Sequence, residues 1–107
     1  MATLSTHVLD TSLGRPAAGV RVALESASGA ELGEGVTDAD GRVASIGPER
    51  LGAGEYRLRF DTGVYFTQLG STGFYPEVVV TFVVEGDEHF HVPLLLSPYG
   101  YSTYRGS

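Results

Sequence analysis

Residues 89–107 read HFHVPLLLSPYGYSTYRGS, and this stretch decides the predicted fold. Side chains in an extended strand alternate between two faces. Four large apolar residues therefore share one face, which predicts a strand with one side in a core: Phe90, Val92, Leu94 and Leu96. Pro98 interrupts strand pairing, and a tyrosine-rich run with a single charged side chain follows it. We therefore expect the terminus to be packed against the domain rather than free.

The same period of two recurs upstream. Residues Glu55–Asp61 alternate without exception between apolar and charged side chains, which is typical of an antiparallel sheet with one buried face. Further strands are predicted at Thr3–Asp10, Gly19–Ser26, Glu31–Thr37, Val43–Ile46, Glu77–Val84 and His89–Ser97.

The segments between these strands are rich in turn-forming residues, and Asp10–Pro16 is predicted to be a loop. Residues Val64–Leu69 have apolar side chains at roughly helical spacing and predict one or two turns of helix. About eight short strands with one short helix predict an all-β protein, a two-sheet antiparallel β-sandwich.

Length and composition narrow the function classes. The chain has 107 residues, which predicts a single domain spanning 1–107. A net charge of −6 argues against nucleic acid as a partner. The absence of cysteine excludes disulfides and a thiolate nucleophile. The apolar runs are too short to span a bilayer, so no membrane partner is expected, and with no signal peptide visible a cytoplasmic location is expected.

The predicted strand Glu77–Val84 is apolar on both faces. Residues 78, 80, 82 and 84 cover one face, and Val79 and Val83 lie on the other. Few helices are available to cover this second face, so it predicts contact with a partner chain.

The three histidines lie in predicted strands. His7 lies in the middle of the first strand, where a lone histidine is either structural or functional. His89 and His91 are two residues apart and project the same way. They are either a metal pair that needs a third ligand from His7 or a carboxylate, or a solvated His89 beside a buried His91.

Arg42 follows a turn formed by residues 38–41, whose spacing does not fit a calcium loop. It is either a solvated arginine or a guanidinium fork for a planar anionic ligand. Ser107 lacks the sequence context of a nucleophile elbow. Its hydroxyl and the terminal carboxylate are nevertheless hydrogen-bonding groups at the chain end.

Several motifs together resemble the 5-hydroxyisourate hydrolase family, the transthyretin-related enzymes of urate breakdown. They are STHVLD at 5–10, DGR at 40–42, FYPE at 74–77, HVPLLLSP at 91–98 and YRGS at 104–107. The terminal tetrapeptide is the most specific of them, because it separates the hydrolases from transthyretin proper, the thyroid-hormone carrier with the same fold.

The resemblance implies a transthyretin-like sandwich that forms a homotetramer, a dimer of dimers, with active sites in a channel between dimers. It implies His7, Arg42, His91 and Ser107 as catalytic residues. It implies a substrate-binding set of Arg42, Tyr104, Arg105, Gly106 and Ser107. His89 inherits no role and is interpreted as structural, and no cofactor and no metal are implied.

The implied reaction is the hydrolytic opening of 5-hydroxyisourate at a cyclic amide bond, giving 2-oxo-4-hydroxy-4-carboxy-5-ureidoimidazoline. Which histidine is the general base stays open at this point. One alternative is a transthyretin-type carrier of small molecules without catalysis. Another is a structural or carbohydrate-associated sandwich, which predicts a solvated and dispensable C-terminus.

Overall fold

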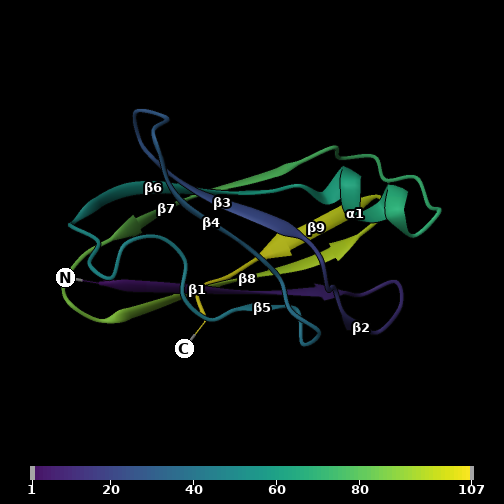
Figure 1. Ribbon diagram of the computed structural model, residues 1–107, viewed down its shortest axis with the longest axis horizontal. Coiled ribbons are helices and arrows are strands. Elements are labelled where there is room, and N and C mark those ends of the chain that lie inside the picture. The colour runs from purple at the N-terminus through teal and green to yellow at the C-terminus, as the bar shows by residue number, and fades with distance from the viewer. Residues whose placement is uncertain (1, 107) are drawn as a thin grey trace.

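The computed structural model describes residues 2–106, whose strands and single helix form two stacked layers (Figure 1). The elements are β1 (Thr3–Asp10), β2 (Arg15–Pro16), β3 (Arg21–Ser26), β4 (Glu31–Val36), β5 (Arg42–Val43), β6 (Gly54–Phe60), α1 (Thr62–Gln68), β7 (Val78–Val84), β8 (His89–Ser97) and β9 (Gly100–Thr103).

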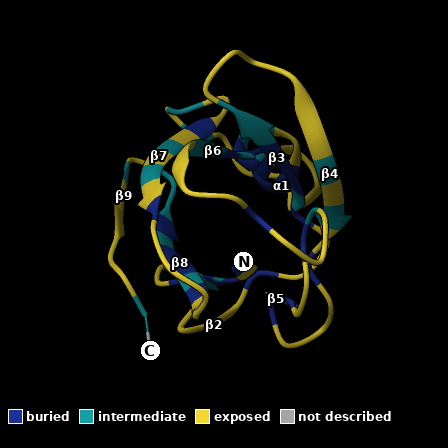
Figure 2. Cartoon of the chain, turned by 90° about the vertical axis from the view of Figure 1, so that its left-hand side faces the viewer, coloured by how far each residue is buried: buried dark blue, intermediate teal, exposed yellow. Residues whose placement is uncertain are grey.

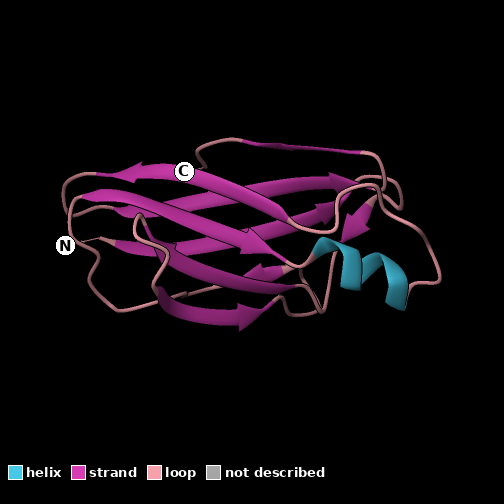
Figure 3. Ribbon diagram, turned by 90° about the horizontal axis from the view of Figure 1, so that it is seen from above, coloured by secondary structure: helices cyan, strands magenta, loops and turns pink. Residues whose placement is uncertain are grey.

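One sheet has the strand order β2-β1-β8-β9, with β5 also paired to β1, and the other has the order β4-β3-β6-β7. Helix α1 connects β6 to β7 at one end of the sandwich, clear of the central strands (Figure 3). The predicted all-β, two-sheet sandwich is therefore confirmed. In the described residues no helix is long and apolar enough to cross a membrane.

One strand pair differs from the predicted antiparallel arrangement. Strands β1 and β8 run parallel, with Thr3 opposite His89 and Asp10 opposite Leu96. The other pairings are antiparallel. Because β1 and β8 lie near opposite ends of the chain, no hairpin restricts their relative direction. The alternation within each strand reports which face is buried, and it carries no information on this direction.

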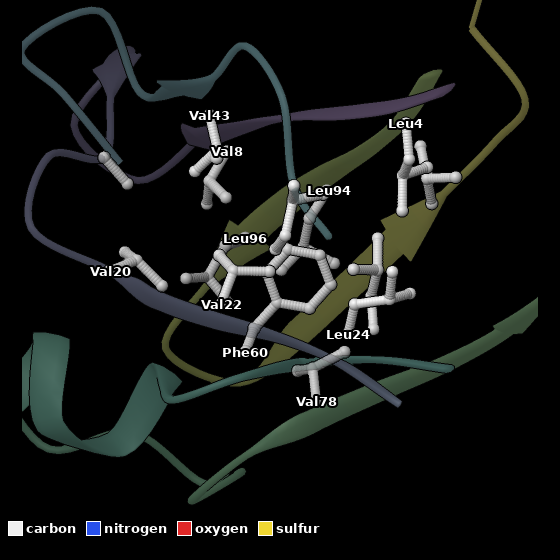
Figure 4. Packing of buried hydrophobic residues seen from close by; sticks show 14 of the residues in the cluster. Leu4, Val8, Val20, Val22, Leu24, Val43, Phe60, Val78, Leu94 and Leu96 are labelled. Carbon is white, nitrogen blue, oxygen red and sulfur yellow. The ribbon is translucent and has the colours of Figure 1, made fainter. Parts of the chain in front are cut away.

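The core lies between the two sheets, as the strand alternation predicts. Figure 4 shows Leu94 and Leu96 of β8 meeting Val22 and Phe60 of the opposite sheet. These four side chains are at most 1% exposed. Burial of this kind of surface is the main favourable term in folding. Strand β9 lies at the outer edge of its sheet and is largely exposed (Figure 2).

Several element boundaries differ from the sequence-based predictions. Residues Arg15–Pro16, predicted as loop, form strand β2 against Leu9 and Asp10 of β1. An edge strand tolerates proline because its missing N–H faces away from the ladder. Strand β5 ends at Val43, where Val43–Ile46 was predicted, and it begins at Arg42.

Helix α1 begins two residues before the predicted start at Val64. Gly63 makes this possible, because a side chain there would meet the backbone of Pro76 at 2.9 Å. The hydroxyl of Thr62 also donates to the carbonyl of Tyr75 at 2.9 Å. Thr62 and Gly63 are residue types typical of loops, but their contacts with Tyr75 and Pro76 place them in the helix.

Asp10 is a buried carboxylate at the end of β1, with 1% of its surface exposed. It accepts hydrogen bonds from the hydroxyl of Tyr65 in α1 at 2.7 Å and from the backbone N–H groups of Ser12 and Leu13 at 3.0 and 3.2 Å. Burial alone raises the pKa of Asp10, but the bonds from Ser12, Tyr65 and Leu13 outweigh it and hold the pKa below its ordinary value. This carboxylate thus fastens the helix to the first sheet.

Candidate active site

His7 and Arg42 are neighbours on the outer face of the first sheet. Residues Leu4, Thr6 and Val8 of β1 are buried in the core. His7 therefore points away from the core, because neighbouring strand positions face opposite ways. Arg42 of β5 is the direct register partner of His7. Directly opposed residues share a face, so the sheet brings the imidazole and the guanidinium together.

His91 joins the same face from β8. Its register partner is Ser5 of β1, two positions before His7. The Ser5 hydroxyl lies 2.7 Å from Nδ1 of His91 and 2.7 Å from Nε2 of His89. The hydroxyl of Thr3 lies 2.6 Å from Nδ1 of His89. These four side chains form one hydrogen-bonded row across β1 and β8.

A tight turn directs Arg42 to this face. The Asp38 carboxylate accepts from the backbone N–H groups of Asp40 at 2.9 Å and Arg42 at 3.0 Å. The hydrogen bond from the Arg42 N–H lowers the pKa of Asp38 most, and the bond from Asp40 lowers it further. Gly41 has a φ of +74°, and a Cβ there would lie 2.4 Å from the carbonyl oxygen of Val8. Only glycine fits this approach of the turn to β1.

The same turn fixes the hydrogen on His7. Nε2 of His7 lies 2.9 Å from the carbonyl oxygen of Asp40. A carbonyl oxygen only accepts, so Nε2 carries the hydrogen and donates it. In the neutral imidazole Nδ1 is then the free acceptor.

The electrostatics of His91 reflect its neighbours. Burial lowers the pKa of His91 most, and the nearby positive groups of Arg42, His7 and His89 lower it further. A hydrogen bond with the backbone of Ser5 acts in the opposite direction and raises the pKa. The net effect places the pKa of His91 below its ordinary value of 6.5, so this imidazole is neutral at neutral pH and can accept a proton.

The C-terminal segment reaches His91 along the backbone. The N–H of Gly106 donates to the carbonyl of His91 at 2.8 Å. A Cβ on Gly106 would lie 2.5 Å from Cδ2 of the His91 ring. The tail therefore packs directly on the imidazole, and glycine is the residue that leaves room for it.

The side chains of Arg105 and Tyr104 lie at Phe90 rather than at His91. The guanidinium of Arg105 lies 4.7 Å from the ring centre of Phe90 and pairs with the carboxylate of Glu88. Tyr104 lines a hollow of about 300 Å³ between β7 and β8, together with Phe82 and Phe90. Ser107 lies outside the described residues.

The structure thus gathers His7, Arg42, His91 and the backbone of Gly106 around one surface. Sequence reasoning did not single out Ser5 or Asp38, which orient these groups. Strand alternation does place Ser5 on the same face as His7, but its pairing with His91 depends on the register of two strands at opposite ends of the chain.

The ring nitrogens of His89 and His91 face hydroxyl groups in the structure, which differs from the metal-pair interpretation. Both ring nitrogens of His89 and Nδ1 of His91 lie beside the hydroxyls of Thr3 and Ser5. In residues 2–106 no three side chains of His, Cys, Asp or Glu gather in a way that could hold a metal ion.

Comparison with known proteins identifies the family of this chain. A sequence model of the HIUase/Transthyretin family matches residues 4–106, nearly the whole described chain. The chain belongs to the HIUase/Transthyretin family. Both the enzymes and the carriers of this family have to be considered for its function.

Three members of the HIUase/Transthyretin family illustrate the range. The 5-hydroxyisourate hydrolase of Salmonella typhimurium is 50% identical over 109 residues, covering 97% of this chain and 80% of the relative. The structure of Klebsiella pneumoniae 5-hydroxyisourate hydrolase superimposes with a TM-score of 0.91 at 45% identity, covering 98% of this chain and 99% of that one. Sea bream transthyretin in complex with thyroxine gives a TM-score of 0.87 at 35% identity, covering 96% and 93%.

Proposed function

We propose that this protein is a 5-hydroxyisourate hydrolase. The observation that carries the proposal is the cluster of His7, Arg42 and His91 on one outer face, with the backbone of Gly106 against His91. Relatives that bear this enzyme's name cover almost the full chain at about half sequence identity. A carrier of hydrophobic ligands has no use for two imidazoles and a guanidinium at one point.

The reaction opens the six-membered ring of 5-hydroxyisourate at a cyclic amide bond. Water attacks the ring carbonyl, the carbon–nitrogen bond breaks, and the product is 2-oxo-4-hydroxy-4-carboxy-5-ureidoimidazoline. This chemistry requires a base near neutral pKa and donors for the oxygen that becomes negatively charged. The side chains of the cluster meet these needs without a cofactor or a metal ion.

His91 is the general base in this proposal. It is the histidine whose pKa is held down by burial and by the positive charges of Arg42 and His7, so that it is neutral and ready to accept the proton of water. A base must be in its unprotonated form at the working pH. His7 donates from Nε2 to Asp40 and presents its other nitrogen to water or substrate.

Arg42 binds the anionic heterocycle in this proposal and polarises the carbonyl under attack. Its guanidinium offers several N–H donors in one plane, which suits a planar ring with adjacent oxygen and nitrogen atoms. The Asp38 turn holds the backbone of Arg42 through the N–H bond at 3.0 Å. This bond fixes the point from which the side chain starts, and donors held in place before charge develops are the most effective in the transition state.

The terminal tetrapeptide completes the substrate side. Gly106 sits on His91, and Arg105 anchors the segment on Phe90 and Glu88. In this proposal residues 104–107 make up the wall that binds substrate: Tyr104 and Arg105 support it from the side of Phe90, and the Ser107 hydroxyl is proposed as a further polar catalytic group.

The assembly in this proposal is a homotetramer, a dimer of dimers, with the outer-face cluster in a channel between dimers. Support comes from exposed apolar side chains: Val79 and Val83 on β7 are 37% and 55% exposed, and Tyr101 on β9 is 44% exposed. Such side chains on sheet faces and edge strands are typical of surfaces that a partner covers.

The decisive assay generates 5-hydroxyisourate from urate with uricase and follows its ultraviolet absorbance with and without the protein. Accelerated decay supports the hydrolase. Decay at the buffer rate contradicts it and favours the carrier alternative, for which sea bream transthyretin bound to thyroxine is the precedent. Calorimetric titration with thyroxine then tests that alternative directly.

A further inference from the structure

A row of four side chains links His91 to the protein surface. It runs from Nδ1 of His91 to the Ser5 hydroxyl at 2.7 Å, on to Nε2 of His89 at 2.7 Å, and from Nδ1 of His89 to the Thr3 hydroxyl at 2.6 Å. Ser5 is buried, whereas His89 and Thr3 are exposed. The proposed mechanism uses only His91 from this row.

The Ser5 hydroxyl restricts the hydrogens on the two imidazoles. A serine hydroxyl has one hydrogen to donate and two lone pairs that accept. At most one of the two facing ring nitrogens can therefore be an acceptor, and the other must carry a hydrogen. The tautomers of His89 and His91 are coupled through this one atom.

The two neutral arrangements have opposite consequences for His91. If Nδ1–H of His91 donates to Ser5, then Nε2 is bare and can accept a proton. If Ser5 donates to Nδ1, then Nε2 carries the hydrogen and the ring is no longer a base at that position. Only the first arrangement also survives protonation of His91, because Nδ1–H keeps its acceptor when Nε2 gains a proton.

We infer that Ser5 is a positioning residue that holds His91 in the Nδ1–H tautomer with Nε2 bare, and that His89 supports this arrangement by accepting the Ser5 hydrogen. The inference rests on the proposed function for its catalytic meaning. It gives a positioning role to Ser5 and to His89, which the sequence analysis interpreted as structural. In the same row Thr3 accepts from Nδ1–H of His89.

The geometry favours a positioning role over a merely structural one. A side chain that only fills space needs no partner of defined polarity, whereas Ser5 touches two ring nitrogens at hydrogen-bond distance on a strand paired in register with β8. A base whose hydrogen is preset needs no reorganisation when the reaction starts.

The first test is the nitrogen chemical shifts of the histidine rings, measured by long-range ¹⁵N–¹H correlation on wild type, Ser5→Ala, Ser5→Thr and His89→Gln. Wild type should show His91 with a protonated Nδ1 and a bare Nε2. Ser5→Ala should shift His91 towards the Nε2–H tautomer, and Ser5→Thr, which keeps the hydroxyl, should restore the wild-type pattern. Ser97→Ala is the matched control, because that hydroxyl bonds the carbonyl of Gly100 rather than a histidine.

The second test is turnover of 5-hydroxyisourate by the same variants. Ser5→Ala and His89→Gln should lower kcat by about tenfold, roughly the rate value of one well-placed hydrogen bond, with KM within about twofold of wild type. Ser5→Thr should recover most of the loss, and Ser97→Ala should equal wild type.

The two tests fail separately. His91 ring shifts that are the same in wild type and Ser5→Ala overturn the inference, whatever the activity. A wild-type protein that does not accelerate decay of 5-hydroxyisourate overturns the proposed function, while the ring shifts still decide whether Ser5 sets the tautomer. A rise in KM alone in Ser5→Ala, with kcat unchanged, also overturns the positioning role.

Discussion

Gly106 and His91 touch in two ways: their backbones share a 2.8 Å hydrogen bond, and the Cα of Gly106 lies against the edge of the imidazole ring. A Cβ at position 106 would approach Cδ2 of His91 to 2.5 Å. We expect Gly106→Ala to displace either the ring or the tail. A displacement of about 1 Å at a catalytic group lowers kcat/KM on the order of 10².

The matched control for this change is Gly100→Ala. A Cβ there would have Ser97 Oγ as its nearest neighbour at 3.7 Å, which is ordinary contact. This variant should keep wild-type kcat/KM, and both variants should keep the melting temperature within a few degrees. Equal activity of Gly106→Ala and Gly100→Ala would show that the tail does not position His91.

Arg42 should influence the titration of His91. Its positive charge is one of the groups, with His7 and His89, that lower the pKa of His91 after burial. Arg42→Gln removes that charge, so the pKa of His91 should rise towards its ordinary value. Because the base acts only when neutral, the acid limb of the kcat/KM profile should move to higher pH.

The direct measurement is an NMR titration of the His91 ring in wild type, Arg42→Gln and the control Arg50→Gln, a substitution in the exposed loop after β5. Only Arg42→Gln should raise the His91 pKa. An unchanged midpoint would mean that Arg42 and His91 do not share an electrostatic environment.

Arg105 should anchor the tail through Phe90 and Glu88. The side chains of Arg105 and Glu88 are 63% and 59% exposed, so loss of their ion pair in Arg105→Ala should change stability little. It should raise KM by about fivefold, the equivalent of one lost interaction. Glu88→Gln should reproduce part of this effect, and Arg50→Ala should have none. A wild-type KM in Arg105→Ala would remove Arg105 from the substrate wall.

The buried pair of Asp10 and Tyr65 should govern acid stability. Tyr65→Phe removes a bond to a buried carboxylate and should lower the free energy of unfolding by about 1.5–3 kcal/mol at neutral pH. The folded-state pKa of Asp10 is depressed below 3.8, so its contribution is present above that pH and is lost as the pH falls through the folded-state value. The gap between wild type and variant should therefore narrow below pH 3.8.

Urea unfolding at several pH values measures this gap. The control is Tyr56→Phe, whose hydroxyl donates to the carbonyl of Gly52 at 2.7 Å in an exposed setting. It should cost less and show no dependence on acid pH. A Tyr65→Phe variant that behaves like the control would contradict the role given to Asp10.

The sequence alone predicted the sandwich because strand alternation depends only on local spacing. The bounds of β1 and β8 were predicted correctly. Strand β2 and the start of α1 were predicted wrongly, because both depend on contacts with distant segments. The parallel direction of β1 and β8 has the same origin.

For the site, the residues named from the family resemblance stay predictions until variants are assayed. The structure adds what spacing could not provide: the register that sets His7 against Arg42, the Ser5 bridge to His91, and the direction of Arg105 towards Phe90. Each of these depends on how strands pair, and pairing is a property of the whole fold.

Hydrolysis with His91 as general base is tested by the initial rate of 5-hydroxyisourate loss in the presence of wild type and of His91→Asn at equal concentrations of folded protein. Wild type should accelerate the loss well above the buffer rate. His91→Asn should reduce this acceleration by a factor on the order of 10²–10⁴, the usual contribution of a general base. Equal rates for the two proteins would exclude His91 as the base, and a wild-type rate equal to that of buffer would exclude the hydrolase activity.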